Sequence, residues 1–275
     1  MFQKTVGFKI FFWVFLIMIG FFAFFPQLWM ISTSLKPESE MFAFSFFSYF
    51  DLSNIVRVLS DSTFLTYLRN GFVVAIASSL FSTVISVFAG YSFSKFRYRG
   101  RKSVMALIMV SQAFPQGLLL LSLYPMMQKI GMLDKLPSIV LAYVALTLPV
   151  GTWTLKAYFD QVPVSIMEAA RVDGSSEWRT MFQIIIPLAI PGMMTIAIYS
   201  FVWAWNDLLY ALTLISSTAN RTLASGMVFT FTGEGGNDWI GMMAASVVAS
   251  IPVAAMFVFL QRYFIAGLTA GAVKG

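Results

Sequence analysis

Residues 10–31 read IFFWVFLIMIGFFAFFPQLWMI, and they contain no Asp, Glu, Lys or Arg. About 20 apolar residues in a helix cross the hydrocarbon core of a bilayer, so this stretch predicts a membrane-spanning helix. Lys4 and Lys9 precede it, as basic residues precede the apolar core of a signal peptide. However, the stretch is longer than the roughly 7–15 apolar residues of such peptides, and no small-residue cleavage site follows it. We therefore expect a retained first helix.

The rest of the 275-residue chain repeats this pattern. Five further stretches without charged residues cover 71–94, 103–128, 136–155, 180–206 and 239–261. Only 11% of all residues are charged, against roughly 25% in a soluble domain. Several spans contain proline, such as Pro115, Pro187 and Pro191, which is expected to kink a helix. The apolar segment 208–220 is too short to span and is expected to extend a helix or lie in the interface. The sequence thus predicts an all-α integral membrane protein with six transmembrane helices, folded as a single domain over residues 1–275.

The basic residues lie mainly on one side of these spans. With the N-terminus placed inside, the inner segments carry 12 Lys and Arg and the outer segments carry 6. The densest cluster, KFRYRGRK at 95–102, is a short loop, where the bias of Lys and Arg toward the cytoplasm is most reliable. Both termini are therefore predicted to be cytoplasmic. We interpret the cluster as a topology anchor rather than as a site for lipid or nucleic acid.

The composition excludes several kinds of chemistry. The chain has no Cys and no His, which rules out disulfides, thiolate or imidazole metal sites and Ser-His-Asp triads. No GxxxxGK[ST] motif is present, so the chain does not bind ATP through a phosphate loop. We expect no catalytic residue, metal site or cofactor in this chain. A transporter or channel acting alone is one alternative, although the spans lack the interior ionisable residues of proton-coupled carriers. A membrane-embedded enzyme or assembly factor is another, and it lacks an acid/base pair.

The longest inner connection, residues 156–179, is more than a polar linker. Pro163 is suited to the start of a short helix, and Gly174 to its end, because glycine adopts the left-handed conformation that closes helices. Ser175 or Ser176 then caps a second helix that leads into the span 180–206. The apolar residues of the first helix have no evident surface of this chain to cover, and they are Ile166, Met167, Ala169, Ala170 and Val172. From the residues alone, this helix fits either the lipid interface or a groove on a soluble partner.

The same connection contains Glu168-Ala169-Ala170, then Gly174 four residues later, and Ile184-x-Ile186-Pro187 after nine more. This pattern resembles the EAA loop of permease subunits in binding-protein-dependent ABC importers. The family usually has Leu in place of Ile186. In that family the loop is a coupling helix seated in a cleft of the ATPase subunit, so the resemblance favours docking and implies the type I ABC importer permease fold. We call residues 156–179 the coupling loop, with the EAA motif region at 163–176. Its expected ATPase-coupling residues are Glu168, Ala169, Ala170, Asp173 and Gly174.

Three other segments resemble carbohydrate importers of this family. They are STSLKP at 32–37, WAWND at 203–207 and the tail GLTAGAVKG at 267–275. The tail is similar to that of maltose-permease G-type subunits, in which it inserts between paired ATPase subunits. This likeness implies a second ATPase contact through Thr269, Gly271 and Lys274.

The resemblance also implies the partners and the substrate class. It implies a heterodimer with a second, homologous permease subunit, two ATPase subunits that bind ATP and Mg, and an extracytoplasmic solute-binding protein. The assembly would lie among the lipids of a bacterial cytoplasmic (inner) membrane and carry a carbohydrate, so this chain is a transport subunit and not an enzyme.

Aromatic and amide groups suit a neutral sugar, and they gather at the end of one span. Tyr199, Trp203, Trp205 and Asn206 are therefore candidates for the substrate pathway. Trp and Tyr near span ends are also typical interfacial anchors, so both interpretations remain open. The Gly-rich outer segment 222–238 is expected to be a flexible loop, which either contacts a binding protein or has no such role.

Overall fold

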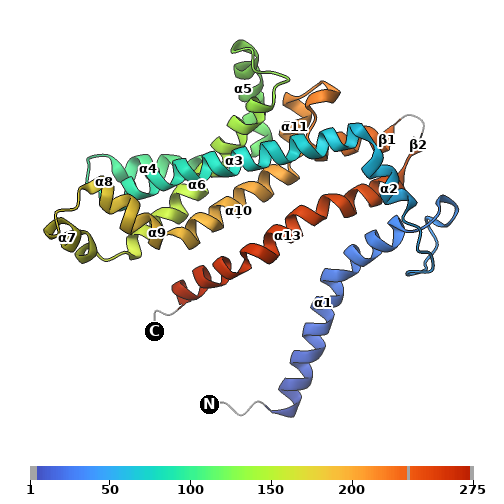
Figure 1. Cartoon of the computed structure of the whole chain (residues 1–275), viewed down its shortest axis with the longest axis horizontal. Helices are drawn as coiled ribbons and strands as arrows, with labels where there is room; N and C mark the ends of the chain where they lie inside the picture. Colours follow the sequence, from blue (N-terminus) through green and yellow to red (C-terminus); the bar gives the residue numbers. More distant parts are fainter. Residues whose placement is uncertain (1–4, 234–235, 273–275) are drawn as a thin grey trace. The chain divides into compact units, whose positions relative to one another are not determined.

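The computed structural model describes residues 5–233 and 236–272, and almost all of its elements are helices (Figure 1). The α-helices are α1 (Val6–Ser34), α2 (Ser53–Ser60), α3 (Ser62–Lys95), α4 (Arg101–Val110), α5 (Gln116–Lys129), α6 (Leu136–Gln161), α7 (Val164–Val172), α8 (Glu177–Thr180), α9 (Ile186–Leu188), α10 (Ile190–Asn206), α11 (Leu209–Leu214), α12 (Leu223–Phe231) and α13 (Trp239–Ala272). Three 3-10 turns are η1 (Glu38–Glu40), η2 (Ser111–Ala113) and η4 (Thr218–Asn220), and η3 (Met181–Ile185) is a π-helical turn. Strands β1 (Thr232–Gly233) and β2 (Gly236–Asn237) form an antiparallel pair.

Within residues 5–233 and 236–272, four helices are long and apolar enough to cross a membrane, and they contain the predicted spans 10–31, 71–94 and 136–155 and nearly all of 239–261. Their spanning parts are Val6–Ser34, Ser62–Lys95, Leu136–Gln161 and Trp239–Leu260. The other two predicted spans are broken. Arg101–Ala113 meets Gln116–Lys129 at 103°, and Glu177–Leu188 meets Ile190–Asn206 at 71°. The number of spans is six only if each bent pair counts as one.

Proline accounts for both breaks. Phe114 has an extended backbone (φ −77°, ψ 133°) because the residue before a proline is disfavoured in the helical region, and Pro115 then starts a new helix direction. In the second pair, Pro187 and Pro191 lie on either side of Ala189, and neither proline has a backbone N–H to donate. The backbone of Ala189, with a ψ of 2°, departs from the α-helical conformation between them. The bends expected at proline in 103–128 and 180–206 are thus present, and each divides its stretch into two helices.

The chain forms two compact units. The first contains Met1–Leu65 and Met227–Pro252. Within it, the segment after α1 is held by Lys36, whose Nζ donates a 2.7 Å hydrogen bond to the carbonyl of Ala43. The same ammonium group lies 4.8 Å from the centre of the Trp29 ring, and the Lys36 side chain is buried. A cation–π contact and a backbone acceptor thus replace the water around this charge.

The second unit contains Thr66–Gly226 and Val253–Gly275, and its core lies among α3, α6 and α10. These helices run side by side in Figure 1. Small residues allow close contact, because a Cβ at Gly90 of α3 would lie 2.9 Å from the backbone nitrogen of Lys156 in α6. Buried hydroxyls join the three helices, since Ser82 lies 2.8 Å from Thr147 and 3.1 Å from Ser200.

Two segments that were not predicted as spans, 208–220 and 222–238, contain helices. The segment 208–220 contains α11 and η4, and Asp134 holds it from the α5–α6 turn. The Asp134 carboxylate accepts hydrogen bonds from the backbone N–H groups of Ser216 and Ser217 at 3.1 and 2.9 Å. The prediction that residues 222–238 form a flexible loop is wrong for residues 223–231, because they form α12.

Candidate functional site

The coupling loop has the predicted helix–glycine–helix structure. Helix α6 continues to Gln161, so residues 156–161 are helical, and α7 begins after Pro163. Gly174 has φ +76°, in the left-handed region. Its N–H donates to the Arg171 carbonyl at 3.0 Å, and the Ser175 N–H donates to the Ala170 carbonyl at 2.9 Å. These two bonds form the Schellman motif that ends many helices.

The second helix starts where a serine cap was predicted. The Ser176 hydroxyl oxygen accepts a hydrogen bond from the Arg179 N–H at 3.3 Å, which caps α8. Arg171 and Glu177 form an ion pair of 2.7 Å across the turn. Both side chains are exposed, and such surface pairs contribute only about 0–1 kcal/mol. The glycine closure and the cap therefore do most to set the angle between α7 and α8.

One face of α7 packs against the rest of the unit. Ile166 and Met167 contact the buried cluster that includes Tyr91, Phe159 and Met181. Ala170 is 5% exposed. The expectation that the apolar residues of α7 have no surface of this chain to cover is therefore wrong for Ile166, Met167 and Ala170, because the ends of α3, α6 and η3 supply that surface.

The other face of α7 is open. Of the five predicted coupling residues, Glu168, Ala169, Asp173 and Gly174 are exposed, and only Ala170 faces the interior. Two large apolar side chains accompany them, with Val164 62% and Val172 88% exposed. Trp178 of α8 is also exposed. The loop thus presents an apolar surface edged by acidic groups.

A cavity of about 520 Å³ lies between the base of α7 and the end of α3. Its polar lining residues are Ser94, Lys95, Arg97, Asp160, Glu168 and Arg171. Lys95 Nζ donates to the Val162 carbonyl at 2.8 Å, and Ser94 Oγ donates to Asp160 Oδ1 at 2.7 Å. The end of α3 is therefore bonded to both α6 and the start of the loop. Among residues 5–233 and 236–272, no cluster of three or more Asp, Glu, His or Cys side chains is arranged to hold a metal ion.

The candidate pathway residues of α10 divide into two groups. Tyr199 and Trp203 border the same cavity of about 420 Å³, which is lined mainly by apolar side chains of α6 and α10. Trp203 also packs edge-on against Tyr143 at 5.2 Å and Tyr210 at 6.1 Å. Tyr210 belongs to α11, and no sequence pattern linked it to this site.

Trp205 and Asn206 lie elsewhere. Trp205 is 5% exposed, packed against Phe72 and Phe201 with ring centres 4.7 and 5.6 Å away. Asn206 is exposed, and its amide nitrogen donates to the Val202 carbonyl at 2.9 Å. The structure therefore brings together Tyr199 and Trp203, and it separates them from the other two candidates.

Asp207 links α10 to the neighbouring helices. One of its carboxylate oxygens accepts a 2.7 Å hydrogen bond from the Tyr143 hydroxyl and bonds at 3.0 and 3.2 Å from the N–H groups of Tyr210 and Ala211. Asp207 thus caps α11. In the C-terminal tail, Thr269 and Gly271 fall within α13, and Lys274 lies outside the described residues.

Comparisons with known proteins agree on one family. A sequence model described as "Binding-protein-dependent transport system inner membrane component" matches residues 82–269. The chain is 34% identical to the trehalose/maltose transport system permease protein MalG of Thermococcus litoralis, over 94% of each chain. It is 35% identical to the sulfoquinovosyl glycerol transport system permease protein SmoH of Agrobacterium fabrum, over 91% of this chain and 89% of that one. In fold it is similar to a chain of a bacterial ABC transporter involved in the import of alginate, with a TM-score of 0.82, 24% identity and coverage of 96% and 100%.

Proposed function

Because the chain belongs to the family of inner membrane components of binding-protein-dependent transport systems, we propose that it is a permease subunit of an ATP-driven carbohydrate importer. The names of two relatives, MalG and SmoH, support the substrate class, since both are permeases for carbohydrates or a carbohydrate derivative. The chain would be a multi-pass protein of a bacterial inner membrane with both termini in the cytoplasm. Its transported molecule is a sugar or sugar derivative.

The importer needs other subunits. This sequence has no phosphate-loop motif, so ATP and Mg would be bound by two separate ATPase subunits. A second, homologous permease would complete the translocation pathway, and an extracytoplasmic solute-binding protein would deliver the substrate. Tyr199 and Trp203 are the side chains of this chain that we propose to line the pathway, because they border one cavity.

The proposal for coupling to an ATPase subunit rests on the two faces of α7. The exposed face, with Val172 at its end, would enter a groove on an ATPase subunit. The inner face, through Ile166 and Met167, packs on the core at the ends of α3 and α6. A displacement of α7 by the ATPase subunit would therefore move these helix ends, and with them the walls of the pathway. The tail residues Thr269, Gly271 and Lys274 would provide a second contact.

Substitution of Val172 tests this docking role. Val172→Asp places a charge on the face that would be buried against the partner, and burying an unpaired carboxylate is costly. We expect the ATPase subunits to be lost during purification, because a tenfold weaker affinity corresponds to only about 1.4 kcal/mol, or substrate uptake per ATP hydrolysed to fall clearly. Val56→Asp is the matched control, because Val56 is an exposed valine of α2 in the other unit. Retention of the ATPase subunits with normal uptake by Val172→Asp would overturn the proposal.

A further inference from the structure

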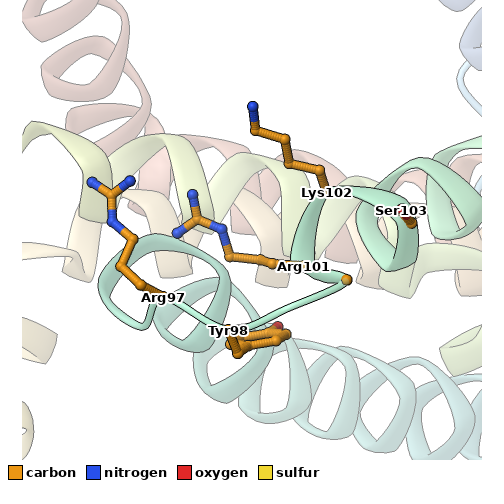
Figure 2. A pocket seen from close by; sticks show the side chains of 6 residues that line it. Arg97, Tyr98, Arg101, Lys102 and Ser103 are labelled. Carbon is orange, nitrogen blue, oxygen red and sulfur yellow. The ribbon is translucent and has the colours of Figure 1, made fainter.

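Two neighbouring cavities share the side chains of Arg101 and Lys102. The first, of about 320 Å³, lies at the loop between α3 and α4 and is lined by Arg97, Tyr98, Gly100, Arg101, Lys102 and Ser103. Figure 2 shows the side chains of Arg97, Arg101 and Lys102 extending to the same side of the ribbon. Three positive charges are thus gathered at one small cavity.

None of these three side chains forms a salt bridge within the described part of the chain, although Arg97 also borders the cavity at the base of α7 together with Asp160 and Glu168. No acidic residue lines the first cavity. Arg101 is held in place, because its guanidinium donates a 2.9 Å hydrogen bond to the Phe96 carbonyl. Like charges held close together repel one another, so an anion bound among them relieves that repulsion. The spread of basic groups suits a phosphate, which guanidinium groups bind through paired hydrogen bonds.

The second cavity, of about 340 Å³, has a different lining. Arg101, Lys102 and Lys156 contribute to it, and its apolar residues are Phe93, Met105, Ala106, Met109 and Trp153. Phe93 and Met105 are buried and form its wall, whereas Trp153 is 54% exposed. A free inorganic anion gains no stabilisation from contact with such an apolar surface, whereas a hydrocarbon chain is stabilised by apolar contact.

Both cavities lie near the ends of candidate membrane spans. Lys95 is the last residue of α3, and Lys156 lies in the last turns of α6. Lipid headgroups occupy this level of a membrane protein, and exposed tryptophans such as Trp153 are enriched there. The basic cavity is thus placed for a headgroup and the apolar cavity for the chain attached to it.

We propose that the two cavities form a binding site for one anionic phospholipid, which revises the interpretation of the 95–102 cluster as a topology anchor alone. Its phosphate lies among Arg97, Arg101 and Lys102, and an acyl chain lies against Phe93, Met105 and Trp153. Basic pockets between transmembrane helices are known to hold anionic headgroups. The site does not include the exposed face of α7, although Arg97 and Lys156 connect it to the coupling loop, and it does not depend on the proposed transport function.

The test measures lipid selectivity with the full-length protein in nanodiscs of phosphatidylcholine. Trace spin-labelled phosphatidylglycerol or spin-labelled phosphatidylcholine is added, and electron paramagnetic resonance gives the immobilised fraction of each. We expect the wild type to immobilise phosphatidylglycerol preferentially. Lys102→Gln should reduce that preference about fivefold, the effect of removing one nearby charge. Lys102→Arg should retain it. Added inorganic phosphate should not displace the labelled lipid, because it cannot fill the apolar cavity.

Arg99→Gln is the matched control for this experiment. Arg99 belongs to the same loop and carries the same charge, but it lines neither cavity. The preference of the Arg99→Gln variant for phosphatidylglycerol should therefore remain close to that of the wild type. An equal loss in Arg99→Gln and Lys102→Gln would overturn the site in favour of diffuse charge attraction. Displacement of the lipid by millimolar inorganic phosphate, or equal immobilisation of both lipids by the wild type, would also overturn it.

Discussion

The backbone N–H of Ser175 donates a 2.9 Å hydrogen bond to the carbonyl of Ala170, across the end of α7. Gly174 lies between these residues with φ +76°, and a Cβ added to it would meet nothing within 4 Å. The position therefore requires glycine for its backbone conformation and not for lack of space. The direction in which the chain leaves α7, and hence the placement of the exposed face of the coupling loop, depends on this conformation.

Substitutions of Gly174 are expected to act in a graded order. A residue with a Cβ costs roughly 1–2 kcal/mol in the left-handed region, and asparagine tolerates it better than a β-branched residue. We predict normal or nearly normal substrate-stimulated ATP hydrolysis for Gly174→Asn and a clear loss for Gly174→Val. Both variants should reach the membrane in equal amounts. Equal activity of Gly174→Val and the wild type would show that the Schellman closure is dispensable for coupling.

Gly90 tests the close approach of α3 and α6. A methyl group there would meet the backbone nitrogen of Lys156 at 2.9 Å and Leu155 Cβ at 3.0 Å, and backbone atoms cannot rotate away. We predict that Gly90→Ala destabilises the protein by about 1–3 kcal/mol. Gly117→Ala serves as the comparison, because its nearest neighbour is Leu209 Cδ2 at 4.0 Å. It should leave the melting temperature in detergent unchanged or slightly raised, since alanine favours helix over glycine.

Apolar stretches predicted where the helices lie, but not how they bend. A charge-free run such as 103–128 satisfies the length of a span whether or not Pro115 turns the chain by 103°. A proline inside a span produces a modest kink or a sharp break according to the helices around it. That information is tertiary, so the run of residue types alone could not supply it.

The same limit applies to the coupling loop and to α10. Ile166 and Val172 are both apolar residues of one short helix, and only the position of α3 and α6 decides which is covered. Trp203 and Trp205 are two residues apart and point to different sides of α10. Only Trp203 borders the cavity. By contrast, Pro163, Gly174 and Ser176 act through their own backbone and side-chain chemistry, and the start, end and cap that they predicted are all present.

The hydrogen bonds of the Asp134 carboxylate predict that the stability of the segment after α11 depends on pH. Burial acts to raise the pKa of its carboxyl, but hydrogen bonds from Ser217 and Ser216 outweigh burial and hold the pKa below its usual value. The folded state therefore prefers the carboxylate, and this stabilisation is complete above the unfolded pKa of about 4 and is lost as pH falls through the folded pKa. We expect hydrogen-exchange protection of the Ser216 and Ser217 amides to fall across this acidic range. In Asp134→Asn, which cannot ionise, protection should be lower and independent of pH; protection of the wild type that stays constant in acid would contradict the prediction.

Substitutions of Tyr199 and Trp205 are expected to distinguish a role in the substrate pathway from a role in packing within one helix. Tyr199 is half-buried at the cavity, so Tyr199→Leu should raise the KM for carbohydrate uptake roughly two- to tenfold, the worth of one aromatic contact, with little change in melting temperature. Trp205 is enclosed by Phe72 and Phe201, so Trp205→Leu should lower stability by about 2–4 kcal/mol. In the molecules that remain folded, its KM should stay near that of the wild type. Uptake assays on vesicles, normalised to folded protein, distinguish the two effects. A raised KM in Trp205→Leu with an unchanged melting temperature would instead place the pathway on the Trp205 side of α10.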